Sequence, residues 1–158
     1  MYCTTHHLSD ILLDDWRKIT ASVPQNSQLF NGTVLQNIVL EEEGDDQKLQ
    51  ELVLLGFDNF INSLPQGFMT VVGEEGINLS GGQKQLLSWM RALYHNPEFI
   101  ILDEPTSSLD VANKAFIYEL IIKVKKNKII FMITHNLENI KNICDEVVVL
   151  KDSSLVKY

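Results

Sequence analysis

The chain has 158 residues, of which 45% are hydrophobic and 22% are charged. A chain of this length buries roughly 70% of its unfolded surface, so one domain with a hydrophobic core is expected. Twenty-one acidic residues against thirteen basic ones give a net charge of −8, which argues against nucleic acid as a partner because phosphate contacts need clustered cations. No apolar run approaches the roughly 20 residues that span a bilayer. Two cysteines, Cys3 and Cys144, make no disulfide framework and favour a reducing compartment.

Residues 26–88 are predicted to form a small helical lobe. Thr33 and Gln36 match a capping box at the start of a helix. Ser80 precedes a longer helical pattern over residues 82–94, which stops before a proline. Between these two helices an apolar stripe with helical spacing predicts another, and its members are Leu49, Leu52, Val53 and Leu55.

Strand and helix patterns alternate from residue 99 onward. Continuous apolar runs predict buried strands, and helices between them imply a parallel sheet, whose ligands bind beyond the carboxyl ends of the strands. The expected strands cover residues 99–102, 129–133 and 146–150. One expected helix begins after Asp110, and a second, shorter one covers residues 137–143. The predicted organisation is residues 1–25 as the end of an N-terminal part of an α/β core, 26–88 as the helical lobe, and 89–158 as the C-terminal half of the core.

The string Leu79-Ser80-Gly81-Gly82-Gln83 is the most specific in the chain. A serine and two glycines open a helix there, and the free N–H groups and positive dipole of a helix N-terminus suit an anionic oxygen. Taken alone, the same residues are equally compatible with an ordinary capped helix behind a flexible turn.

Two carboxylates, Asp103 and Glu104, follow the apolar run 99–102. Asp103, at the end of a buried strand, could orient Mg²⁺ through water, while Glu104 points elsewhere and could polarise an attacking water. An acidic strand-to-loop turn without catalysis is the alternative. His135 follows the next strand, where a histidine either donates a hydrogen bond to a phosphate oxygen or simply caps the strand.

Taken together and in order, these motifs resemble the nucleotide-binding domain of an ATP-binding cassette (ABC) transporter, in its exporter form. The resemblance implies a P-loop NTPase-like (RecA-like) parallel sheet with helices on both faces, plus a helical subdomain that carries the signature motif. The similar segments are 23–25 with 29–38 (Q-loop), 73–85 (signature), 99–104 (Walker B with its glutamate), 107–110 (D-loop) and 134–135 (switch histidine).

The resemblance also implies roles for individual residues. Gln25 would sense Mg²⁺ and the attacking water and relay to transmembrane helices, and Asp103 would hold Mg²⁺. Glu104 would be the general base, and His135 would contact the γ-phosphate. Residues that would bind ATP held by an opposite subunit, or act across that dimer interface, are Ser80, Gly81, Gly82, Gln83 and Asp110.

The implied cofactors and partners are those of a transporter. ATP and Mg²⁺ would be bound, a second nucleotide-binding domain would complete a homo- or heterodimer, and transmembrane domains would hold the assembly at the cytoplasmic face of the plasma (inner) membrane. The parent reaction would be MgATP hydrolysis coupled to export.

One family motif is missing. No Gly-x-x-x-x-Gly-Lys-Ser/Thr sequence occurs, so the phosphate loop, and with it the first strands of the core, are absent, and we expect the chain alone not to hydrolyse ATP. Two alternatives stay open. The chain could be a catalytically incompetent fragment that regulates a partner by donating its signature motif in trans. It could also be the C-terminal lobe of a DNA-repair or chromosome-maintenance ABC ATPase, which the acidic charge and the 54-position spacing of Gln25 and Leu79 disfavour.

Overall fold

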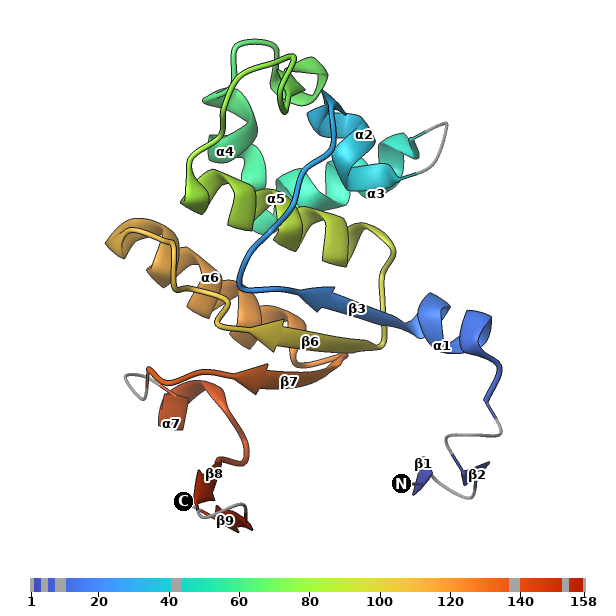
Figure 1. Cartoon of the computed structure of the whole chain (residues 1–158), viewed down its shortest axis with the longest axis vertical. Helices are drawn as coiled ribbons and strands as arrows, with labels where there is room; N and C mark the ends of the chain where they lie inside the picture. The colour runs from blue at the N-terminus through green and yellow to red at the C-terminus, as the bar shows by residue number, and fades with distance from the viewer. Residues whose placement is uncertain are drawn as a thin grey trace.

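A computed structural model describes residues 2–3, 6–7, 11–40, 44–136, 140–151 and 154–157. A lobe of short helices lies at one end, a three-stranded sheet follows in the middle, and a small hairpin lies at the other end (Figure 1). Across this described part of the chain, no helix combines the length and the apolar character needed to cross a membrane.

The lobe consists of short helices stacked on the long helix α5 (Gly81–Tyr94), as Figure 1 shows. The predicted capping box is confirmed, because the Thr33 hydroxyl accepts from the Gln36 N–H at 3.1 Å and the Gln36 side chain accepts from the Thr33 N–H at 2.8 Å. Gly56 has φ +112° and breaks the helical run that the apolar stripe predicts. The other elements are β4 (Gly32–Thr33), α2 (Val34–Val39), α3 (Asp46–Leu52), the π-helical turn η2 (Val53–Phe57), α4 (Asp58–Asn62), the 3-10 turn η3 (Gly67–Met69) and β5 (Val71–Val72).

The central sheet is parallel and has the order β3-β6-β7. Strands β6 (Phe99–Asp103) and β7 (Ile129–Ile133) match the predicted strands, and α6 (Val111–Val124) begins after Asp110 as expected. The first strand, β3 (Thr20–Val23), was not predicted. Its polar Thr20 and Ser22 give no apolar run, and only its pairing with β6 makes it a strand.

The expectation for residues 146–150 was wrong in one respect. A strand does form there, as β8 (Val148–Lys151), but it pairs antiparallel with β9 (Ser154–Lys157) and lies outside the parallel sheet. Two strands that follow each other this closely along the chain and pair with each other are antiparallel, and they satisfy each other's backbone locally. The helix predicted over residues 137–143 is described only as α7 (Ile140–Ile143), since residues 137–139 lie outside the described part.

Shorter elements complete the chain. Helix α1 (Leu13–Ile19) leads directly into β3, and two short strands, β1 (Tyr2–Cys3) and β2 (His6–His7), pair antiparallel near the N-terminus. The division of the chain into residues 1–25, 26–88 and 89–158 remains a prediction, and α5 runs continuously across its second boundary.

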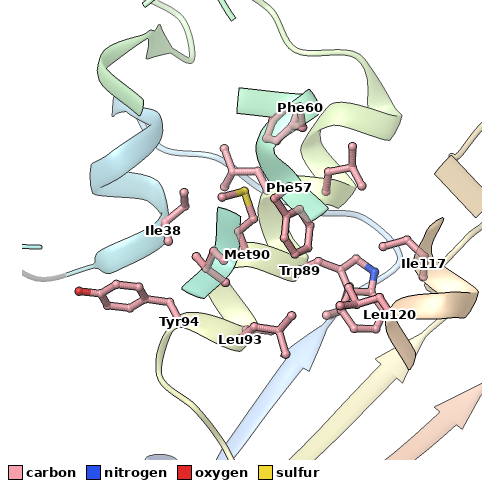
Figure 2. Packing of buried hydrophobic residues seen from close by; sticks show 14 of the residues in the cluster. Ile38, Phe57, Phe60, Trp89, Met90, Leu93, Tyr94, Ile117 and Leu120 are labelled. Carbon is pink, nitrogen blue, oxygen red and sulfur yellow. The ribbon is translucent and has the colours of Figure 1, made fainter. Parts of the chain in front are cut away.

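One hydrophobic core joins the lobe to the sheet. Trp89 of α5 is fully buried, and Figure 2 shows its ring beside Ile117 and Leu120 of α6. On the lobe side, Phe57 meets Phe116 of α6 edge-on, with ring centroids 5.2 Å apart. Helix α5 therefore packs against the lobe and against the sheet layer at once, which fixes its N-terminus relative to the strand ends.

The two faces of the sheet differ in burial. Ile100 and Leu102 point into the core and are fully buried. On the opposite face Ile129, Phe131 and Ile133 are 68%, 52% and 50% exposed, although strands of parallel sheets are usually covered on both sides. The helices of the described residues therefore cover one face of this sheet and leave much of the second face open.

This asymmetry predicts that two substitutions on opposite faces of the sheet change the free energy of unfolding by very different amounts. Leu102→Ala removes fully buried methyl groups and should lower the free energy of unfolding by about 2–5 kcal/mol. Phe131→Thr keeps a good strand former on the open face and should change it by about 0.5 kcal/mol or less. Urea denaturation of the whole chain followed by circular dichroism measures both, and equal losses would contradict the open face.

Candidate functional site

The carboxyl ends of β6 and β7 bring the predicted catalytic residues together. The strands pair in parallel register up to Asp103 and Ile133, and the Glu104 N–H then donates to the Ile133 carbonyl at 2.9 Å. This bond extends the pairing by one residue. It places Glu104 directly beside the segment that carries Thr134 and His135.

The Glu104 carboxylate is held by three donors. One oxygen, Oε1, lies 2.7 Å from His135 Nδ1 and accepts from the His135 backbone N–H at 2.8 Å. The other, Oε2, accepts from the Thr134 hydroxyl at 3.2 Å. The Glu104 side chain is 14% exposed and that of His135 is 83% exposed. The carboxylate is thus fixed at the strand ends, while the imidazole faces outward.

The hydrogen bonds of Glu104 lower the pKa of its carboxyl group. Burial by itself raises the pKa of the carboxyl, but the hydrogen bonds from the side chain and backbone of His135, with that from Thr134, outweigh it and leave the pKa below its usual value. The carboxylate is therefore ionised at neutral pH and can accept a proton.

Asp103 and Gln25 leave the same edge of the sheet. Val23, the last residue of β3, pairs with Leu102, so Gln25 lies just beyond one strand end and Asp103 at the next. Gln25 is exposed, and in the described part of the chain no hydrogen bond joins it to Asp103 or Glu104. The structure brings Glu104 and His135 into contact but leaves Gln25 apart.

The donor set at this edge suits one kind of metal site. Among the described residues, no cluster of three or more His, Cys, Asp or Glu side chains could enclose a metal ion. Mg²⁺ usually keeps several waters and binds through one or two carboxylates together with substrate phosphates. The single carboxylate of Asp103 at this strand end fits Mg²⁺ that arrives with a nucleotide, not a resident metal cage.

The signature residues form a second cluster at the N-terminus of α5. Ser80 and Gln83 make a capping box, in which the Ser80 hydroxyl accepts from the Gln83 N–H at 3.2 Å and the Gln83 side chain accepts from the Ser80 N–H at 2.9 Å. The N–H groups of Gly81 and Gly82 find no partner among the described residues. With the helix dipole behind them, these N–H groups suit a phosphate oxygen.

Asp110 joins this second cluster. It caps α6 by accepting from the Asn113 N–H at 2.8 Å, and it lines a pocket together with Asn113 and the signature residues Ser80, Gly81, Gly82 and Gln83. The five residues expected to act across a dimer interface therefore share one surface pocket.

Two polar residues inside the predicted motifs were given no individual role by the sequence. Thr134 holds Glu104, as described above, and the fully buried Gln85 bonds to the backbone of Glu104 and Ser108. A glutamine in the middle of an apolar helix stripe was the signal for the second, because buried polar groups need partners.

The lowered pKa of Glu104 generates a prediction. Its ionised form is favoured in the folded chain, so this stabilisation is complete above the pKa of an unfolded glutamate, about 4.3, and is lost as the pH falls through the lowered pKa of the folded chain. The difference in free energy of unfolding between the native chain and Glu104→Gln should therefore shrink between pH 6 and pH 3. Urea titrations at several pH values measure it, and a difference that does not change with pH would contradict the geometry.

Comparison with known proteins agrees with these motifs. The family model described as "ABC transporter" matches residues 2–107. ABC transporter B family member 6 of Dictyostelium discoideum is 41% identical over 153 residues, which is 96% of this chain and 22% of that protein. A putative multidrug export ATP-binding/permease protein of Staphylococcus aureus is 36% identical over 154 residues, 96% of this chain and 26% of that protein.

A solved structure gives the same result for the fold. A bacterial Atm1-family ABC exporter with ATP bound superposes with a TM-score of 0.83 at 31% identity, covering 94% of this chain and 26% of that one. This likeness confirms the predicted α/β, P-loop NTPase-like fold class, although the helices of the described residues cover mainly one face of the sheet and not the expected two. The chain spans about a quarter of the length of these relatives. It belongs to the ABC transporter family, as part of an ATP-binding domain of the exporter type.

Proposed function

We propose that this chain forms part of the ATP-hydrolysing domain of an ABC exporter and works in a dimer of such domains. The observation that carries the proposal is the Glu104 carboxylate, fixed beyond the ends of two parallel strands and 2.7 Å from His135 Nδ1. A parallel sheet with this arrangement binds its ligand at that edge, beside Asp103.

Each residue of this edge has a distinct part in the proposed reaction. Asp103 would hold the Mg²⁺ that accompanies a bound nucleotide, an ion that would supply positive charge at the phosphates. Glu104, ionised at neutral pH, accepts a proton from the attacking water. His135 keeps the carboxylate oriented through Nδ1, and its exposed ring is free to contact the γ-phosphate. Gln25, exposed beyond β3, would have to move inward to sense the site.

In this proposal the pocket around Ser80, Gly81, Gly82, Gln83 and Asp110, here called the signature pocket, binds a different ATP molecule. The free N–H groups of Gly81 and Gly82, with the Ser80 hydroxyl, face a pocket at the surface of the chain, not the edge where Glu104 lies. Such a pocket can bind a phosphate group of ATP that is held by another subunit. Asp110, on the rim of the same pocket, acts across that dimer interface.

A groove on the lobe fits the proposed transmembrane partner. Residues 26–31 and Leu79 are among those that line it. Arg91 of α5 ties this segment to the core by donating to the carbonyls of Asn37 at 2.7 Å and Gln28 at 3.3 Å. A helix of a membrane domain seated here would be coupled to α5, at the cytoplasmic face of the membrane.

The missing phosphate loop favours a restricted role for the chain by itself. No Gly-Lys-Ser/Thr motif is available to hold the β-phosphate. The second candidate function, a non-catalytic partner that donates its signature motif in trans, needs only the pocket around Ser80, which is built in this chain.

We expect the purified chain alone to show no Mg²⁺-dependent ATP hydrolysis above background, because nothing in its sequence supplies the phosphate loop. A coupled-enzyme assay at millimolar MgATP measures this, with Glu104→Gln as the blank for contaminating ATPases. Turnover that exceeds this blank would refute the expectation.

We further expect the chain to associate with an intact ABC exporter cassette, one that carries its own phosphate loop, only when MgATP is present. Ser80→Ala should weaken this association roughly tenfold or more, since a hydrogen bond to a charged phosphate is lost. Sedimentation velocity with and without MgATP measures the effect.

The chain offers a matched control in its second capping box. Thr33→Ala removes the equivalent cap from α2 and should cost a similar stability of about 1 kcal/mol, yet it lies outside the signature pocket. If Thr33→Ala weakens the association as much as Ser80→Ala does, the proposed role of Ser80 is wrong.

A further inference from the structure

One buried polar side chain connects the two functional clusters. Gln85 lies on the first turns of α5, just after the signature residues, and is 1% exposed. Its amide nitrogen donates to the Glu104 carbonyl at 3.0 Å, and its amide oxygen accepts from the Ser108 N–H at 3.3 Å. A single side chain thus spans from the signature helix to both ends of the loop that follows β6.

The backbone of Glu104 needs this support. Its φ is +47°, a left-handed conformation that is costly for a residue other than glycine and persists only where the surroundings enforce it. The N–H is fixed to the Ile133 carbonyl at 2.9 Å, and the carbonyl accepts from the Ser107 N–H at 3.1 Å as well as from Gln85. The peptide groups on both sides of the carboxylate are therefore restrained.

The start of α5 also packs closely on the far end of the same loop. A Cβ on Gly82 would approach the Ser108 carbonyl oxygen to 3.1 Å, and one on Gly81 would lie 3.5 Å from the Ser108 Cβ. Gly82 thus lies in tight contact with the Ser108 end of the loop.

We propose that Gln85 is a positioning residue, which locks the loop from Glu104 to Ser108 onto the signature helix so that occupation of the signature pocket sets the placement of the Glu104 carboxylate. The catalytic consequence rests on the proposed function. The mechanical part, one amide that holds both ends of the loop, stands on the contacts above.

A glutamine suits this role because its amide is a donor and an acceptor at once. Methionine has a similar shape and can make neither bond. Glutamate keeps an acceptor for the Ser108 N–H but has no donor for the Glu104 carbonyl. The two replacements therefore separate loss of both contacts from loss of the Glu104 contact alone.

Amide hydrogen exchange of the whole ligand-free chain, followed by NMR, tests the proposal. The reporter is the His135 N–H, which bonds to the Glu104 carboxylate at 2.8 Å and does not contact Gln85. Gln85→Met should speed exchange at His135 and at Ser108 roughly five- to tenfold. Gln85→Glu should speed exchange at His135 while Ser108 remains protected.

Thr106→Val is the matched control. Thr106 lies in the same loop, is buried, and its hydroxyl is 3.5 Å from the Tyr118 hydroxyl, on the side of α6. The Thr106→Val substitution should leave the exchange rate of the His135 N–H within about twofold of the native rate. If the loss of any buried contact loosened the whole loop, Thr106→Val would also speed exchange at His135.

The proposal is overturned if His135 keeps its native exchange rate in both Gln85 variants, or if Thr106→Val speeds it equally. It is also overturned if both Gln85 variants fail to fold while Thr106→Val folds, since Gln85 would then be a folding residue only. These readouts need no nucleotide. If the Gln85 variants change the exchange rates as expected but the chain fails to associate with an ABC cassette in MgATP, the proposed function is contradicted and the positioning role of Gln85 stands.

Discussion

Parallel pairing of β6 with β3 on one side and β7 on the other is the constraint on which the site depends. It directs three carboxyl ends to one edge of the sheet, where the Glu104 N–H continues the ladder onto the Ile133 carbonyl at 2.9 Å. The Glu104 carboxylate can meet His135 only because this last backbone bond brings their segments together. Together with the bonds that Gln85 and Ser107 donate to the Glu104 carbonyl, this backbone bond restrains the left-handed φ of +47° at Glu104.

Helix α5 connects this edge of the sheet to the rest of the chain. Its N-terminus forms the signature pocket, its first turns hold the loop after β6 through Gln85, and its middle packs Trp89 against α6. Near its end, Arg91 fixes the segment that lines the lobe groove. One helix thus contacts the pocket around Ser80, the loop after β6 and the segment that lines the lobe groove.

The open face of the sheet is the main departure from a closed α/β core. Half-exposed Phe131 and Ile133, with Ile129, form an apolar strip on β7. The partly buried Phe99 and Ile101 of β6 lie in register with Ile129 and Phe131. Buried apolar area stabilises a fold at about 25 cal/mol per Å², so this strip contributes little in the chain as described. The stability of the chain rests on the single core between the sheet, α5, α6 and the lobe.

Local patterns were enough to determine much of this protein. The capping boxes at Thr33 and Ser80, the strands β6 and β7, and the order of the motifs follow from short-range chemistry, which neighbouring residues decide among themselves. Tertiary structure alone made a strand of residues 20–23, because its pairing partner β6 is distant in the sequence. Strand β8 pairs instead with its sequence neighbour β9, and only the folded chain showed which of the two possible partners it takes. Tertiary structure alone also placed Gln85 between Glu104 and Ser108, since a buried amide takes its role from the groups that the fold brings to it.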